Sequence, residues 1–409
     1  MRPHIRPARH GDGAALARID FATWSPLHAV TERPKAPADP FFDGHRDPRE
    51  HLVAEEDGEL LGYAVVRRPV PLPAFAHVRQ IQGLAVLEEA RGRGVARALL
   101  RACVAEARAQ DAPAAVPAHA VTGYWQNFNN GATVQTLADV PDAYDIIAVS
   151  FADATANAGE ITFTLDSAGL GGYTDEQFRA DLAAKQADGK SVIISVGGEK
   201  GAVAVNDSAS AQRFADSTYA LMEEYGFDGV DIDLENGLNS TYMTEALTKL
   251  HEKAGDGLVL TMAPQTIDMQ SPENEYFKTA LATKDFLTVV NMQYYNSGSM
   301  LGCDGQVYAQ GTVDFLTALA CIQLENGLDA SQVGIGVPAS PKAAGGGYVE
   351  PSMVNDALDC LTRGTGCGSF KPEKTYPALR GAMTWSTNWD ADTGNAWSNV
   401  VGPHVDDLP

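Results

Sequence analysis

Short apolar runs alternate with longer amphipathic segments from residue 119 to the end of the chain. The runs are rich in β-branched and aromatic residues, which is typical of buried strands. Segments between them, such as 174–189 and 210–226, repeat apolar residues about every 3.6 positions and end in Gly, which predicts helices. Eight strands are predicted, at 119–125, 144–152, 191–198, 226–235, 257–264, 286–295, 332–340 and 379–386.

Eight strand–helix units predict an α/β protein with a (β/α)8 TIM barrel over residues 119–409. A doubly wound open sheet is the structural alternative. Such a sheet rarely reaches eight regular units, and no GxGxxG sequence follows the first predicted strand. In a barrel of this kind the chemistry lies at the carboxyl ends of the strands, so polar residues there are the candidates for function.

Composition changes near residue 117. Residues 1–117 carry 16 Lys and Arg against 15 Asp and Glu, a net charge of +1, whereas the remainder carries 14 against 38, a net charge of −24. The Ala- and Pro-rich stretch 109–121 between them is typical of a linker or domain boundary. We therefore predict a first segment at 1–112, a linker at 113–118 and the barrel at 119–409.

The total charge of −23 argues against nucleic acid or an anionic membrane as a partner, because phosphate neutralisation needs a basic surface. No apolar run approaches the roughly 18 residues that a membrane helix needs. The basic N-terminus is not followed by the apolar segment of a secretory signal, so the sequence predicts cytosolic synthesis or a leader lost from the chain.

The cysteines follow the same division. Cys103 is alone in the first part, and four cysteines lie in the second. Cys360 with Cys367 would close a short loop, and Cys303 with Cys321 is the natural second pair. This pairing indicates an oxidising compartment, and four unpaired buried thiols are the alternative.

Four carboxylates fall within eight residues of the predicted fourth strand, FDGVDIDLEN at 227–236. Because side chains alternate along a strand, Asp231, Asp233 and Glu235 should point together into the barrel lumen. Like charges this close cannot all ionise near neutral pH, so at least one should hold a proton. Glu235 is nearest the mouth and is the candidate proton donor, with its pKa raised by the neighbouring charge. A structural ion-pair or metal site is the alternative, and Asp228 is interpreted as structural.

This stretch, together with SVGG at 195–198, resembles the SxGG and DGxDxDxE motifs of the chitinases of glycoside hydrolase family 18. Asp228, Gly229 and the three lumen carboxylates each fall on a motif position. The resemblance extends through GYWQNFNNG, MAPQ, MQYYN and Trp385 and is strongest to secreted actinobacterial chitinases. It implies a hydrolase of chitin or chito-oligosaccharides with a retaining, substrate-assisted mechanism and no enzyme nucleophile.

The resemblance also implies residue roles. Glu235 would protonate the glycosidic oxygen, Asp233 would orient the substrate acetamido group and Asp231 would share its proton. Tyr295 would donate its hydroxyl to the acetamido oxygen, and Gln293, on the same face of the sixth strand, would bind nearby. The remaining substrate-binding candidates are Trp385 as the floor under the sugar, Met262 and Gln265 as cleft lining, and Tyr124, Trp125 and Phe128, for which sugar stacking and simple packing are both open.

Several alternatives stay open. Trp385 could be core filler, and the whole barrel could be an endo-β-N-acetylglucosaminidase acting on N-glycans or a chitin-binding lectin. Lectins of this family typically lack the proton donor, so the presence of Glu235 favours an enzyme. Between the seventh and eighth strands only one helix is predicted, which leaves no room for an additional α+β insertion and predicts a shallow, open cleft with endo cleavage.

The first segment resembles the GNAT family of N-acetyltransferases. Its strand GLAV is followed by RGRGVA at 91–96, in which Arg91, Gly92, Gly94 and Ala96 match the acetyl-CoA pyrophosphate loop. Backbone N–H groups at a helix N-terminus bind phosphate well. The family's second half is absent by about residue 118, so we expect a vestigial loop rather than an intact acetyltransferase.

We therefore expect no cofactor and no metal. The expected partner is chitin or a chito-oligosaccharide, without nucleic acid or membrane, and the expected state is a monomer. Resemblance and cysteine pairing predict an extracellular location, while the absence of a signal leaves a cytoplasmic one open.

Overall fold

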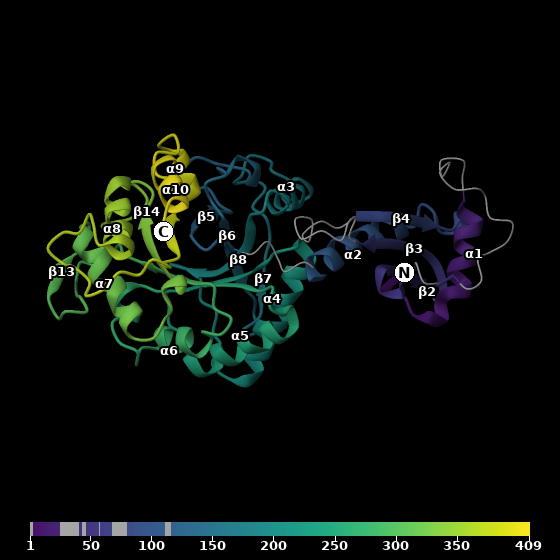
Figure 1. Ribbon diagram of the computed structural model, residues 1–409, viewed down its shortest axis with the longest axis horizontal. Helices are drawn as coiled ribbons and strands as arrows, with labels where there is room; N and C mark the ends of the chain where they lie inside the picture. Colours follow the sequence, from purple (N-terminus) through teal and green to yellow (C-terminus); the bar gives the residue numbers. More distant parts are fainter. Residues whose placement is uncertain (1–2, 25–40, 43–45, 57, 68–79, 111–115) are drawn as a thin grey trace. The chain divides into compact units, whose positions relative to one another are not determined.

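A computed structural model describes residues 3–24, 41–42, 46–56, 58–67, 80–110 and 116–409 (Figure 1). The chain divides into two compact units, Met1–Pro113 and Ala114–Pro409. Part of the predicted linker 113–118 lies outside the described residues, so its boundaries stay a prediction. No helix in the described part of the chain is long and apolar enough to cross a membrane.

The first unit has a four-stranded antiparallel sheet in the order β1-β2-β3-β4. Helix α2 packs on one face, around Leu99 and Cys103, and α1 packs on the other, around Leu16 and Ile19. The elements are β1 His4–Pro7, α1 Gly13–Thr23, β2 His51–Glu56, β3 Glu59–Arg67, β4 Gln80–Val86 and α2 Val95–Gln110.

The second unit is a closed barrel of eight parallel strands, because the first strand β5 pairs with both β6 and the last strand β15. All eight predicted strands are confirmed, most with shorter bounds. They are β5 Ala120–Gln126, β6 Ile146–Ala154, β8 Ser191–Gly198, β9 Gly229–Leu234, β10 Val259–Met262, β11 Val289–Gln293, β14 Val333–Pro338 and β15 Gly381–Trp385.

Helices surround the strands of this unit (Figure 1). Several begin with a side chain that accepts the first free N–H groups, as Thr174 does for α3 and Asp207 for α4. The helices are α3 Asp175–Ala187, α4 Ser208–Tyr225, α5 Ser240–Ala254, α6 Glu275–Ala282, α7 Val313–Glu325, α8 Pro351–Arg363, α9 Thr387–Ala391 and α10 Ser398–Asp406. Between β14 and β15, α8 is the single helix of the described segment 339–380.

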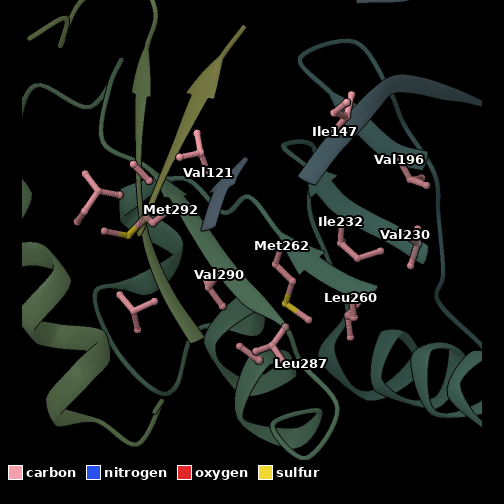
Figure 2. Close-up of a cluster of buried hydrophobic side chains, with 14 of the residues drawn as sticks. Val121, Ile147, Val196, Val230, Ile232, Leu260, Met262, Leu287, Val290 and Met292 are labelled. Carbon is pink, nitrogen blue, oxygen red and sulfur yellow. The ribbon is translucent and has the colours of Figure 1, made fainter. Parts of the chain in front are cut away.

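Strand side chains alternate between two separate cores. Figure 2 shows the core between strands and helices, where Val230 and Ile232 of β9 lie near Leu260 of β10. The lumen holds the other parity, with a small apolar cluster that includes Ile146, Ala148, Ile193, Val259, Val289 and Met383. Each fully buried aliphatic side chain contributes about 1.5–3 kcal/mol of transfer free energy, so the larger outer core fixes the strand register.

Two of the candidates for substrate binding point away from the lumen, so the expected cleft-lining role of Met262 is wrong, and for Trp125 the packing alternative holds. Met262 shares its parity with Leu260, is fully buried and lies in the helix-facing core (Figure 2). Trp125 is also fully buried on that side, packs against Phe178 and donates its indole N–H to the carbonyl oxygen of Gln135 at 3.1 Å. Neither side chain faces the lumen, so neither can line a sugar site there.

Both predicted disulfides are present. Cys303 bonds to Cys321 and Cys360 bonds to Cys367. The first ties a hairpin of β12 Ser299–Leu301 and β13 Val307–Ala309 to helix α7. Cys103 is buried in the core of the first unit.

Asp228 lies just before β9 and joins neighbouring elements of the barrel. Its carboxylate accepts the backbone N–H of Val192 and a hydrogen bond from the Gln186 side chain, at 2.8 and 2.7 Å. These contacts tie the start of β9 to β8 and α3, which agrees with the structural role expected for Asp228.

Candidate active site

The carboxylate row of β9 runs up the lumen towards the barrel mouth, and burial falls along it. Asp231 is completely buried, Asp233 is 4% exposed and Glu235 is partly exposed. Val230 and Ile232 point to the helices and Asp231 is bonded across the lumen, so the alternation of side chains predicted for this strand is present. A reactant at the mouth would reach Glu235 first, while Asp231 is shielded from water.

Asp231 accepts three hydroxyl groups from three other strands. Tyr124 on β5 and Ser195 on β8 each donate to its Oδ2 at 2.7 Å, and Thr261 on β10 donates to its Oδ1 at 2.5 Å. Hydrogen bonds to an ionised acceptor are the strong ones, so this arrangement stabilises the Asp231 carboxylate inside an apolar lumen.

Two amide side chains hold the upper part of the row. Gln293 at the end of β11 donates through Nε2 to Asp233 Oδ1 at 2.8 Å and approaches Glu235 Oε1 at 3.4 Å. Gln265 approaches the other oxygen, Glu235 Oε2, through its Nε2 at 3.3 Å. The two N–H groups of Gln293 are taken by Asp233 and by the carbonyl oxygen of Ala263 at 2.9 Å, so Gln265 is the amide with an N–H left for Glu235.

Burial pushes the carboxyl groups deep in the lumen towards their neutral forms. Burial raises the pKa of Asp231, and the three hydroxyl donors oppose that rise. Burial raises the pKa of Asp233 well above its ordinary value, the charges of Asp231 and Glu235 add to it, and the Gln293 hydrogen bond opposes it. A proton held by this pair is therefore more stable on Asp233 than on Asp231.

The pKa of Glu235 is also raised. Burial is the largest cause, the hydrogen bonds from Gln293 and Gln265 oppose it, and the charges of Glu199 and Asp268 add to it. From the sequence we expected a contribution from the next carboxylate along the strand, and these two groups do repel each other, because the charge of Glu235 raises the pKa of Asp233. Glu199 and Asp268, which follow β8 and β10, add charges that the strand alone does not predict.

Tyr295 follows β11 and lies beside the row. It is 9% exposed, and its pKa is raised well above the ordinary value by burial and by the charges of Asp233, Glu235 and Asp231. The phenol therefore stays protonated and able to donate. Tyr124, in contrast, lies below the row and gives its hydroxyl to Asp231, so the structure places it as a partner of the acid rather than at an exposed sugar surface.

Aromatic rings gather around Trp385 at the end of β15. Phe151 is stacked on the indole with ring centres 5.8 Å apart, Phe128 lies 6.4 Å away and Tyr124 lies 5.7 Å away. Trp385, Phe151 and Phe128 are each partly exposed. A flat apolar surface of this kind fits the face of a sugar ring.

The SVGG motif has a steric role beside the row. Gly197 has φ +124°, and a Cβ there would lie 2.1 Å from the carbonyl oxygen of Asp233. Only a residue without a side chain lets β8 approach β9 at this level, and the preceding Ser195 then reaches Asp231.

Three residues at or behind the row were not singled out from the sequence. Thr261 and Phe151 are one and two strands away from β9 in the barrel order, and Tyr276 comes from helix α6. Thr261 could have been found, because period-two alternation in the fifth strand puts it on the lumen face. Nothing in the local sequence marks Phe151 or Tyr276.

One group of potential metal ligands exists among the described residues, Cys303, Cys321 and Glu325. Its two sulfur atoms are bonded to each other, so they do not offer thiolate ligands. The carboxylate row itself is held by hydroxyl and amide donors, which are partners of carboxylates rather than of cations.

In the first unit, the predicted phosphate loop precedes helix α2. Gly92 and Gly94 have φ +75° and +82°, and Arg91 and Arg93 are exposed, the latter paired with Glu56. Ala96 lies in the first turn of α2. The loop therefore has open backbone at a helix start, as a phosphate site needs.

The closed barrel and the acid row at its carboxyl-terminal mouth define a (β/α)8 protein whose candidate active site lies in the lumen. Residues 120–401 match the family model described as glycosyl hydrolases family 18. This match covers more than half of the chain, and the chain belongs to that family.

The barrel is similar to several known proteins. A solved Streptomyces coelicolor structure described as a candidate chitinase A is 76% identical, with a TM-score of 0.71, and the match covers 71% of this chain and 99% of that one. A family GH18 chitinase structure from Chromobacterium violaceum is 36% identical with a TM-score of 0.66, covering 71% of this chain and 84% of that one. Chitinase D of Niallia circulans is 37% identical in an alignment of 326 positions, and the match covers 70% of this chain but 61% of that protein.

Residues 15–123 match the model of the acetyltransferase (GNAT) family. The match begins after β1 and ends within β5, a strand of the barrel. Among the described residues of the first unit it therefore includes β2, β3 and β4 of the single sheet.

Proposed function

We propose that the barrel is a chitinase that hydrolyses β-1,4 linkages between N-acetylglucosamine units of chitin and chito-oligosaccharides. The observation that carries the proposal is the graded burial of the carboxylate row, which leaves Glu235 partly exposed at the mouth, with its pKa raised by burial and with the Gln265 amide beside its carboxyl group. Similarity to proteins named chitinases supports the choice of substrate.

The reaction we propose is retaining and substrate-assisted. Glu235 gives its proton to the glycosidic oxygen as the bond to the anomeric carbon breaks. The carbonyl oxygen of the substrate's own 2-acetamido group attacks that carbon and forms an oxazolinium ion, which water then opens with Glu235 accepting the proton. Tyr295 would donate to the acetamido oxygen, and Trp385 would lie under the sugar.

Asp233 would accept the acetamido N–H and balance the charge of the ion. In the free protein we infer that the proton of the lower pair is held on Asp233, because Asp231 already accepts three hydroxyl groups. When the acetamido group arrives, that proton must move away from the substrate side, and Asp231 is the neighbouring base. This is a more specific form of the shared proton expected from the sequence.

We propose endo cleavage. The described segment between β14 and β15 contributes α8 and loops, with no additional sheet to form a wall beside the mouth. A long chain could then enter from the side rather than by its end. We further propose that the barrel acts as a monomer, since every residue of the row and its partners comes from one barrel, and that neither nucleic acid nor membrane is a partner, in line with the net charge of −23. Two disulfides favour an extracellular site of action.

The test is hydrolysis of a chito-oligosaccharide by the wild type and by Glu235→Gln. The variant keeps the shape of the side chain but has no proton to give, so we expect kcat to fall by about 10²- to 10⁴-fold with the fold retained. Glu273→Gln, the same change at an exposed carboxylate, is the control and should be fully active. Full activity of Glu235→Gln would refute the mechanism, and an inactive wild type would point to a lectin.

The same wild-type assay on long soluble chitin examines the cleavage mode. Endo cleavage lowers viscosity early and gives products of mixed length. Steady release of dimers from one end would contradict it, and cleavage of N-glycans in preference to chito-oligosaccharides would favour the endo-β-N-acetylglucosaminidase alternative.

A further inference from the structure

The backbone hydrogen bonds between β9 and β10 end at Ile232, before the strand reaches the proposed proton donor Glu235. Ile232 pairs with Met262, and the N–H of Ala263 donates to the carbonyl oxygen of Ile232 at 2.9 Å. In a regular parallel ladder the next two bonds would run from Leu234 N–H to Ala263 and from Gln265 N–H to Leu234. Neither bond is present in the barrel, all of which the structure describes.

Side chains take over the backbone groups that the ladder releases. The N–H of Leu234 donates to the hydroxyl of Tyr276 at 2.5 Å, and the carbonyl oxygen of Ala263 accepts from Gln293 at 2.9 Å. The N–H of Gln265 donates to Asp268 at 3.1 Å. The two strands can therefore separate beside Glu235 without leaving these buried groups unpaired, which would be costly.

Among these replacements, the Tyr276 hydroxyl contacts the backbone that joins Asp233 to Glu235. It accepts the N–H of the peptide that joins Asp233 to Leu234, and it lies 3.2 Å from the carbonyl oxygen of Leu234, in the peptide that continues to Glu235. The carbonyl oxygen of Ile232 is at 3.4 Å but already accepts from Ala263. The single phenol proton is therefore best given to Leu234, so one oxygen bridges both peptides.

Tyr276 is itself firmly held. It is the second residue of α6, is 3% exposed and belongs to the helix-facing core. On one side, Asn274 donates to the carbonyl oxygen of Ile267 at 2.7 Å, and on the other Glu275 accepts the N–H of Ser240 at the start of α5, at 2.8 Å. Because the start of α6 is held on both sides, the Tyr276 hydroxyl has a fixed position and can fix the position of the β9 backbone that it contacts.

We propose that Tyr276 is a positioning residue for the proton donor: from behind the barrel wall, its hydroxyl fixes the two peptides that carry Asp233 and Glu235 and so sets the height of the Glu235 carboxyl at the mouth. The inference rests on the proposed function, in which Glu235 protonates the leaving oxygen. Tyr276 does not reach the lumen and touches no substrate.

The test uses Tyr276→Phe and two substrates that differ in their need for a proton. A sugar leaving group depends strongly on general acid catalysis, whereas the aryl leaving group of a 4-methylumbelliferyl chitobioside is a weaker base and depends on it less. A misplaced Glu235 should lower kcat/KM for a chito-oligosaccharide about tenfold and leave kcat/KM for the aryl substrate nearly unchanged. The comparison uses kcat/KM because this quantity reports the cleavage step and not the later step in which Glu235 accepts a proton from water.

The ratio of the two rates is independent of how much variant is folded, so a stability loss cannot mimic the effect. Tyr173→Phe is the matched control, since Tyr173 is also a buried outer-core phenol that accepts a backbone N–H, from Leu137. Its rate ratio should equal that of the wild type. An equal loss on both substrates, or no loss, in Tyr276→Phe would overturn the positioning role, whereas a wild type that cleaves neither substrate would refute the proposed function itself.

Discussion

Gly347 allows a sharp test of the proposed role of Tyr295. It has φ +91°, and an added Cβ would lie 2.6 Å from the Cα and 2.9 Å from the Cβ of Tyr295. The loop cannot simply move away, because the N–H of Asn296 donates to Gly346 at 3.0 Å and the N–H of Gly346 donates back to the Asn296 side chain at 3.1 Å. Gly347→Ala must therefore displace Tyr295.

The magnitude follows from the contact. Ordinary carbon contacts begin near 3.4 Å, so relief of a 2.6 Å contact needs a shift of about 0.8 Å, the difference between the two. Misplacement of a reacting group by 1 Å can cost about 10²-fold, so we expect kcat for a chito-oligosaccharide to fall by roughly 10- to 100-fold. The left-handed conformation adds about 1–2 kcal/mol of lost stability for alanine.

The assay is kcat and KM, with the thermal midpoint measured on the same samples. Gly298→Ala is the control for backbone strain alone. Gly298 has φ +66°, but a Cβ there would meet nothing within 4 Å and so would not displace a neighbouring residue. That control should lose stability and keep kcat. Wild-type kcat in Gly347→Ala, or an equal loss of kcat in Gly298→Ala, would refute the reasoning.

Two further predictions concern charge and covalent links. Glu199→Gln removes a negative charge that raises the pKa of Glu235, so that pKa should fall. Because the donor works in its protonated form, the alkaline limb of the kcat profile should move to lower pH with the low-pH rate unchanged, and a limb that stays in place or moves up would contradict the assignment. Replacing Cys303 and Cys321 by Ala, which opens a loop with a sequence separation of 18, should lower the free energy of unfolding by about 3 kcal/mol in denaturant titrations. A midpoint equal to that of the wild type would show that the bond does not constrain the unfolded chain.

The periodic spacing of apolar residues was sufficient to predict the barrel and the shared face of the acidic residues. The eight strands, the shared face of Asp231 and Asp233, and both disulfides follow from spacing along the chain, because alternation and short loops are local properties. The same rule would have placed Trp125 and Met262 towards the helices. Both were candidates because they lie in segments that resemble the family, and strand parity, which decides the direction of a side chain, was not applied to them.

What the sequence could not supply is mostly non-local. Charges that raise the pKa of Glu235 come from Glu199 and Asp268, which follow β8 and β10, and the parallel pairing of these two strands with β9 brings them together. Phe151 and Tyr276 likewise reach the site from a different strand and from a helix. These residues lie far from the carboxylate row in the sequence and meet it only in the folded barrel, so no short stretch of sequence could reveal their contribution.

The early end of the β9–β10 ladder also changes what holds each level of β9. Up to Ile232 this strand pairs with both neighbouring strands, whereas beside Glu235 the amides of Leu234 and Gln265 depend on one phenol and one carboxylate. A side-chain hydrogen bond can be removed by one substitution, whereas a backbone ladder bond cannot. A single change in α6 or after β10 can therefore shift the proposed proton donor, while the base of the carboxylate row keeps its place.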